Sequence, residues 1–128
     1  MNSRVVLADD HKPFRDALRN MLERNRDIEI VGVAGVSADA VELARSLRPD
    51  VIVMDVSMSR VAGVATLRQT LVAHPPVKVI VLSVTTDSVF AADMLAAGAS
   101  ACVTKADAEE LPHVIRAVLN GISYPAPR

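Results

Sequence analysis

The amino-acid sequence predicts an α/β domain built on a doubly wound, five-stranded parallel sheet. Five short apolar segments alternate with five segments that have the period of an α-helix. The apolar segments lack regular polar alternation, which is typical of parallel strands covered by helices on both faces. Strict alternation of strand and helix favours such a sheet. The 128 residues are enough for one domain with a substantial core.

Apolar residues predominate in each predicted strand, and they recur three or four positions apart in each predicted helix. The strands are expected at Val5–Ala8, Ile28–Ala34, Val51–Met54, Val77–Leu82 and Ala101–Thr104. The helical stripes consist of Phe14, Ala17, Leu18, Met21 and Leu22; Ala40, Leu43, Ala44 and Leu47; Val64, Leu67 and Leu71; Phe90, Met94 and Leu95; and Leu111, Val114, Ile115, Val118, Leu119 and Ile122.

Residues that favour helix ends stand at matching places in the sequence. Pro13 suits the first turn of the first helix. Ser37 and Asp87 are predicted to cap the N-termini of the second and fourth helices. Gly98 is predicted to follow the C-terminus of the fourth helix.

Composition limits the function classes. The formal net charge of -1 gives no general basic field for nucleic acid. The single cysteine excludes an internal disulfide and fits a reducing compartment. No apolar run reaches the ~20 residues needed to cross a bilayer, and the first residues lack a signal-peptide pattern. We therefore expect a soluble, cytoplasmic protein that does not contact membranes.

The end of the chain differs in composition from the rest. Residues 122–128 follow Gly121 and contain two prolines, which is typical of an interdomain linker. The globular domain is therefore expected to span residues 1–121, as one module of a longer protein.

Charged residues stand at the carboxyl ends of three predicted strands. Asp9 and Asp10 follow the first strand, Asp55 ends the third and Lys105 follows the fifth. In a parallel sheet these ends open onto one crevice, where such folds bind ligands. Three carboxylates held close together repel one another unless a cation joins them. The pattern therefore predicts a site for a hard divalent cation with oxygen ligands.

The sequence around these residues carries a further pattern. Asp55 lies in Val-Ile-Val-Met-Asp-Val-Ser-Met, Ser83 in Val-Leu-Ser, and Lys105 follows Ala-Gly-Ala-Ser-Ala-Cys-Val-Thr. With Asp9 and Asp10, these motifs resemble the receiver domain of bacterial two-component response regulators, and the match covers essentially the whole chain. The resemblance implies a flavodoxin-like receiver fold with the strand order 2-1-3-4-5.

Three further motifs resemble one subfamily of response regulators. They are Asp10-His11-Lys12, the Leu82-Ser83 ending of the fourth strand and the ending Asn120-Gly121-Ile122-Ser123-Tyr124. This subfamily carries a C-terminal LuxR-type helix-turn-helix domain, which these 128 residues do not contain. DNA is therefore expected to be contacted only through that missing domain.

The resemblance implies a role for each residue of the site. Asp55 would accept a phosphoryl group from a sensor histidine kinase, and Lys105 and Ser83 would contact that group. A bound Mg²⁺ or Mn²⁺ would be held by a set of oxygen ligands. These are the carboxylates of Asp9, Asp10 and Asp55 and the backbone carbonyl of Ser57.

The resemblance also implies an output. Phosphorylation would change conformation through Ser83 and favour a homodimer that controls transcription. The protein would be a switch rather than an enzyme, although self-phosphorylation and autodephosphorylation at Asp55 are expected. One departure affects this output, because Cys102 stands where many family members have a Tyr or Phe that moves on activation.

The same residues also have simpler interpretations. The three aspartates could cap separate helices, Lys105 could be solvated, and Ser83 could be a helix cap. An apolar strand surrounds Cys102, which favours a small buried residue over a reactive thiol. The three histidines, His11, His74 and His113, are expected at the surface.

Other functions on the same fold fit less well. A flavin carrier needs a hydroxyl- and Gly-rich phosphate loop after the first strand, where this chain has Asp9 and Asp10. An aspartyl phosphatase would need a second acid at position 57, which is Ser57. A degenerate receiver, acting as a phosphorylation-independent dimerisation or interaction module, remains as the alternative.

Overall fold

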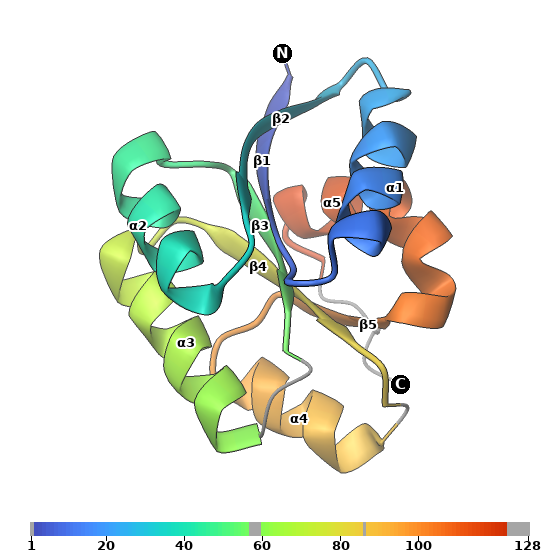
Figure 1. The fold of residues 1–128 in the computed structure, drawn as a ribbon. Coiled ribbons are helices and arrows are strands. Elements are labelled where there is room, and N and C mark those ends of the chain that lie inside the picture. The colour runs from blue at the N-terminus through green and yellow to red at the C-terminus, as the bar shows by residue number, and fades with distance from the viewer. Residues whose placement is uncertain (1, 57–59, 86, 123–128) are drawn as a thin grey trace.

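The computed structural model describes residues 2–56, 60–85 and 87–122, which form one parallel sheet with helices on both faces (Figure 1). The five strands are ordered β2-β1-β3-β4-β5, so the predicted fold class and strand order are confirmed. The strands are β1 (Ser3–Ala8), β2 (Ile28–Ala34), β3 (Val51–Asp55), β4 (Lys78–Ser83) and β5 (Ala101–Thr104).

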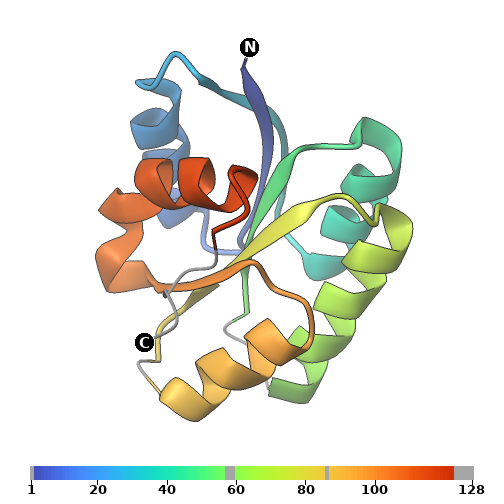
Figure 2. The ribbon, with the colours of Figure 1, turned by 180° about the vertical axis from the view of Figure 1, so that it is seen from behind.

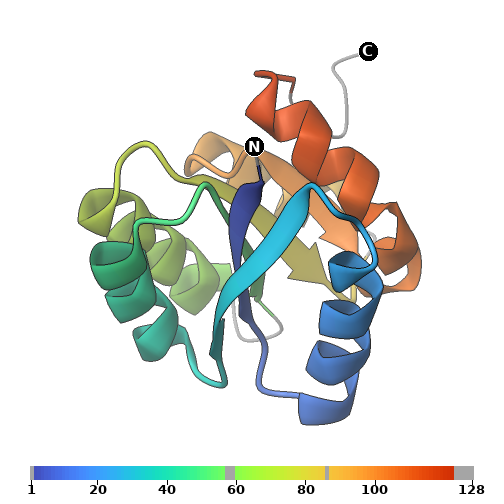
Figure 3. The ribbon, with the colours of Figure 1, turned by 90° about the horizontal axis from the view of Figure 1, so that it is seen from above.

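Five α-helices connect or follow the strands, as the sequence predicts. They are α1 (Lys12–Glu23), α2 (Ser37–Leu47), α3 (Arg60–Ala73), α4 (Ser88–Ala96) and α5 (Leu111–Leu119). A short 3₁₀-helix, η1 (Lys105–Glu110), precedes α5 and was not indicated by the sequence pattern. Viewed from above, α1 and α5 cover one face of the sheet, and α2 and α3 lie on the other (Figure 3).

The hydrophobic core has two halves, one on each face of the sheet. Alternate residues of β1 divide between them: Val5 and Leu7 pack toward α1 and α5, while Val6 and Ala8 pack toward α2, α3 and α4. Every residue of β3 is buried because this strand lies in the middle of the sheet. Burying such side chains supplies most of the driving force for folding.

Helix ends follow the predicted signals in three of four places. Pro13 lies in the first turn of α1. Asp87 caps α4, because its Oδ1 accepts a 2.9 Å hydrogen bond from the Val89 amide. The prediction for Ser37 is wrong: α2 begins at this residue, and Val36 occupies the N-cap position.

Gly98 follows α4 with a φ of +115°, a conformation that disfavours a side chain. A Cβ at this position would lie 2.6 Å from Leu71 Cδ1 on α3. The missing side chain therefore lets the end of α4 pack closely on α3, as expected of a glycine after a helix C-terminus.

Three positions in the predicted stripes are exposed instead of buried. Ala17 on α1 is exposed, and the apolar stripe of α5 ends at Val118, since Leu119 and Ile122 face solvent. Ile122 lies beyond the end of α5. The stripes therefore predict the buried faces correctly except at Ala17 and at the C-terminal end of α5, where the predicted stripe extends too far.

His74 was expected at the surface, and this prediction is wrong. The imidazole is buried, and its Nε2 lies 3.1 Å from the Pro49 carbonyl oxygen, to which it donates. Pro49 precedes β3, and His74 follows α3, so the hydrogen bond joins two loops at the amino end of the sheet. His11 and His113 are exposed as predicted.

Two arginines make further contacts at the amino end of the strands. Arg4 Nη1 donates to the carbonyls of Leu47 and Arg48, which end α2. Arg116 on α5 forms two hydrogen bonds with the carboxylate of Asp27, which precedes β2. Figure 2 shows α5 from the side where it lies beside α1.

Candidate functional site

Strand register brings the carboxyl ends of β1, β3, β4 and β5 to one edge of the sheet. Ala8 pairs with Met54, and Ser83 pairs with Thr104. The next residue after each strand therefore reaches the same crevice. This places Asp9 beside the end of β3 and Lys105 beside the end of β4.

Three carboxylates meet in this crevice. Each of Asp9, Asp10 and Asp55 offers a ligand oxygen, and the three oxygens lie within 4.8 Å of one another. Asp9 and Asp55 are buried, whereas Asp10 is exposed. The cluster therefore opens to solvent on the Asp10 side, and its geometry matches the predicted acidic site.

Lys105 lies against two of the carboxylates. Its Nζ is 3.0 Å from Asp9 Oδ2 and 3.6 Å from Asp55 Oδ1. The same nitrogen lies 4.7 Å from the centre of the Phe14 ring on α1, which allows a cation–π contact. The sequence predicts the ammonium but not the aromatic ring that covers it.

Two opposing influences act on the pKa of Lys105. Burial is the largest single influence and lowers the pKa, because it disfavours the charged ammonium. The hydrogen bonds and charges of Asp9 and Asp55 together outweigh burial, so the pKa lies above its usual value of 10.5. Lys105 is therefore a permanent cation in this site at neutral pH.

Asp9 is fixed by its neighbours more completely than Asp10. Its amide donates to the Ala34 carbonyl, and its Oδ1 accepts a 2.8 Å hydrogen bond from the His11 amide. Its Oδ2 is buried and pairs with Lys105 by charge, but has no well-aligned hydrogen bond from the described residues. An oxygen held in this way retains the capacity to bind a cation.

Ser83 is buried at the end of β4, where it forms a local turn. Its Oγ accepts a 3.0 Å hydrogen bond from the Thr85 amide and donates to the Thr85 carbonyl at 3.2 Å. Ser83 therefore stands at the carboxyl end of β4, and its hydroxyl is bound within the β4–α4 loop.

Cys102 lies on β5, outside the acidic cluster. Its side chain is partly buried, somewhat less than predicted, and burial raises the pKa of the thiol above 9.0. It lines a hollow of about 420 Å³ between β5 and α4, together with Thr85, Phe90 and Leu95. The thiol is therefore protonated at neutral pH and faces a largely apolar space.

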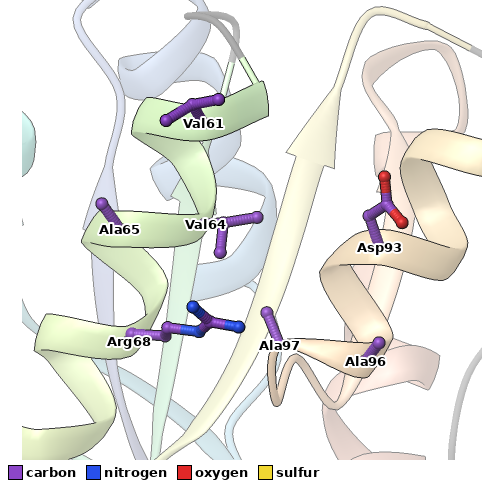
Figure 4. Close-up of a pocket in the computed structure, with 7 residues that line it drawn as sticks. All are labelled: Val61, Val64, Ala65, Arg68, Asp93, Ala96 and Ala97. Carbon is purple, nitrogen blue, oxygen red and sulfur yellow. The ribbon is translucent and has the colours of Figure 1, made fainter.

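A second hollow, of about 450 Å³, lies between α3 and α4. Val61 and Val64 line it from α3, and Ala96 and Ala97 line it from α4 (Figure 4). The side chain of Arg68 extends across it toward Ala97. None of the clustered carboxylates lines this hollow, so it is separate from the acidic site.

One predicted ligand cannot be placed. Ser57, whose backbone carbonyl is expected to bind the metal, lies outside the described residues.

In the described part of the chain, no helix is long and apolar enough to span a membrane.

Comparison with known proteins places this fold and site in a family. A family model described as the response regulator receiver domain matches residues 5–116. The response regulator GacA of Pseudomonas aeruginosa is 36% identical over 126 residues, which cover 98% of this chain and 59% of GacA. The transcriptional regulatory protein DegU of Brevibacillus brevis is 35% identical over 125 residues, which cover 97% of this chain and 53% of DegU.

Solved structures agree with this placement. The crystal structure of a LuxR-family two-component response regulator from Aurantimonas sp. SI85-9A1 matches with a TM-score of 0.88 and 31% identity, over 96% of this chain and 89% of that one. The chain belongs to the response regulator receiver domain family. It spans little more than half the length of GacA and DegU.

Proposed function

We propose that Asp55 accepts a phosphoryl group from a phosphohistidine of a sensor histidine kinase, with Mg²⁺ or Mn²⁺ bound beside it. The protein then acts as a cytoplasmic signalling switch rather than as an enzyme. The observation that carries this proposal is the position of Asp55. Its carboxylate ends a central strand, lies within reach of a cation shared with Asp9 and Asp10, and faces the Lys105 ammonium.

The proposed transfer forms one bond to phosphorus and breaks another. A carboxylate oxygen of Asp55 attacks the phosphorus, so that an O–P bond forms as the N–P bond of the phosphohistidine breaks. The imidazole nitrogen keeps the bonding electrons and takes up a proton. Lys105 is placed to offset negative charge on the transferred group, since its Nζ is 3.6 Å from Asp55 Oδ1.

The residues present fit a hard divalent cation. The candidate ligands are all carboxylate oxygens, and Asp9 Oδ2 is buried without a well-aligned hydrogen bond from the described residues. Asp10 leaves one side open to solvent, which suits Mg²⁺ because this ion keeps several of its waters. When bound, the cation offsets the repulsion between the carboxylates and the incoming phosphoryl group.

Ser83 would carry the signal away from the site. To donate to a phosphoryl oxygen on Asp55, its hydroxyl must leave the Thr85 carbonyl. This exchange of partners would move the β4–α4 loop, which borders the hollow beside Cys102. Cys102 has no ring that could move with the loop, so the loop itself is proposed to change the surface formed by α4 and β5.

The output is proposed to be transcriptional. One relative, DegU, is named a transcriptional regulatory protein, and it is nearly twice as long as this chain. A second domain would therefore contact DNA, and phosphorylation would favour a homodimer of the regulator.

Intact-mass measurement after incubation with acetyl phosphate and Mg²⁺ tests the proposal directly. We expect one added phosphoryl group, which is lost in the Asp55→Asn variant and after chelation of the metal. Asp50→Asn is the matched control, because Asp50 precedes the same strand at the opposite end and should not affect labelling.

The absence of an adduct would favour the alternative of a phosphorylation-independent interaction module. Rapid autodephosphorylation would also hide an adduct, so a beryllofluoride complex serves as the second measurement. Failure to bind beryllofluoride in the presence of Mg²⁺ would contradict phosphoacceptor function.

A further inference from the structure

We infer that Arg15 is a positioning residue that orients the peptide group between Asp9 and Asp10 and thereby sets the affinity of the acidic cluster for a divalent cation. The inference rests on the proposed function, because it concerns the cation site of that function. Arg15 lies in α1, one turn after the loop that carries the two aspartates.

The contact is made to the backbone. Arg15 Nη1 donates a 2.9 Å hydrogen bond to the carbonyl oxygen of Asp9. This oxygen belongs to the planar peptide group that joins Asp9 to Asp10. A charged guanidinium donor forms a strong hydrogen bond, so one contact restrains the backbone of both aspartates.

The position of Asp10 depends on this restraint more than the position of Asp9 does. Its carboxylate is exposed and makes no hydrogen bond or ion pair with the described residues. Asp9 is also held through His11, Ala34 and Lys105. The position of the Asp10 oxygen therefore depends on the backbone of the loop, and hence on the peptide group that Arg15 restrains.

The guanidinium is packed into the fold instead of extending into solvent. Its Nε is buried and has no hydrogen-bond partner among the described residues, which is unfavourable for the folded state. Its Nη1 lies close to Gly35, where an added Cβ would be only 3.2 Å away. Gly35 follows Ala34, whose carbonyl accepts from the Asp9 amide, so the loop is held from two sides.

Charge and position predict opposite effects on cation binding. The positive charge of Arg15 near the cluster repels a cation, so removing the charge alone would tighten Mg²⁺ binding. Removing the hydrogen bond frees the Asp9–Asp10 peptide and would weaken binding. The sign of the change therefore distinguishes positioning from electrostatics.

Calorimetric titration of the 128-residue chain with Mg²⁺ tests the inference. We expect Arg15→Ala to weaken Mg²⁺ binding about tenfold, as is found when partners of metal ligands are removed. Arg15→Lys keeps the charge but loses the planar donor group, so binding should also weaken. Arg19→Ala is the matched control, because Arg19 lies one turn further along α1 and pairs with Glu23 at the surface.

Gly35→Ala provides a test that leaves Arg15 unchanged. The new methyl group would displace the guanidinium by a few tenths of an ångström, so Mg²⁺ binding should weaken by a smaller factor. This variant keeps the inference testable if Arg15→Ala does not fold.

Labelling with acetyl phosphate separates positioning from a general loss of structure. A positioning role raises the Mg²⁺ concentration for half-maximal labelling of Arg15→Ala and leaves the rate at saturating Mg²⁺ unchanged. Equal or tighter Mg²⁺ binding by Arg15→Ala, or a reduced rate at saturation, would overturn the inference. If the unaltered chain binds no Mg²⁺, the proposed function fails, and this inference fails with it.

Discussion

The two ends of the sheet differ in how their charged groups are paired. At the amino end, the Arg4 guanidinium binds the carbonyls that end α2, and Arg116 binds Asp27 through two hydrogen bonds. At the carboxyl end, three carboxylates lie within 4.8 Å of one another, and Lys105 pairs with two of them. Contacts at the amino end are matched, whereas negative charge is in excess in the acidic cluster.

Charged residues at the amino end therefore stabilise the fold, whereas the fold keeps the carboxylates at the carboxyl end close together despite their repulsion. Matched hydrogen bonds at the amino end stabilise the loops that join the strands. Like charges at the carboxyl end oppose folding until a cation joins them. The acidic cluster is therefore expected to lower the stability of the metal-free protein.

The largest effect should follow the loss of the Lys105 ammonium, which pairs with Asp9 and Asp55. Lys105→Met leaves two buried carboxylates without this partner and should lower the free energy of unfolding by about 3 kcal/mol without metal. Urea unfolding with a chelator measures the change. Lys12→Met is the control, because Lys12 pairs with Asp16 at the surface, where an ion pair contributes little, and the free energy of unfolding should stay nearly unchanged.

The pH dependence of this effect follows from the raised pKa of Lys105. Its contribution is fully present below the unfolded pKa of 10.5 and is lost as the pH rises through the higher folded value. The native protein and Lys105→Met should therefore approach each other in stability only above pH 10.5. Equal stability at neutral pH would show that the ion pair contributes nothing.

Mg²⁺ should offset the repulsion between the carboxylates at the carboxyl end of the sheet and so stabilise the fold. A concentration one hundred times the dissociation constant would stabilise the fold by about 2.7 kcal/mol. Thermal unfolding measured during a Mg²⁺ titration should show a midpoint that rises with concentration, and Asp10→Asn should reduce the rise. A constant midpoint across the titration would contradict a cation site.

The smallest effect is expected at the amino end. Hydrogen bonds from Arg116 are the largest influence on the pKa of Asp27 and hold it below its usual value of 3.8, against the opposing effect of burial. The contribution of Asp27 is therefore present above pH 3.8 and is lost as the pH falls through the lower folded pKa. Asp27→Asn should be slightly less stable than the native protein at neutral pH, and chemical unfolding should show this difference closing in acid. A difference that persists in strong acid would exclude the ion pair as its cause.

The strands could be predicted well because their signal is local. β2 and β5 have the predicted bounds, β4 is shifted by one residue, and β3 extends one residue further, to Asp55. Continuous apolar runs mark strands that are buried on both faces, and the strand ends then place Asp9 and Lys105 in one crevice. The geometry of the cluster followed from this topology.

What could not be predicted depends on contacts between distant segments. His74 is buried because its partner, the Pro49 carbonyl, lies 25 positions away in another loop. Helix periodicity gives no sign of that hydrogen bond. In the same way, the covering of Lys105 by Phe14 depends on where α1 lies relative to the residue that follows β5, which no local pattern reveals.

The order in which the site residues occur along the chain has a consequence for synthesis. Asp9 and Asp10 leave the ribosome about 95 residues before Lys105, and Asp55 emerges long before β5 exists. A nascent chain that stops short of position 105 therefore carries the carboxylates without their ammonium. Completion of the acidic site coincides with addition of the last strand of the sheet, so a prematurely terminated product lacks a complete site.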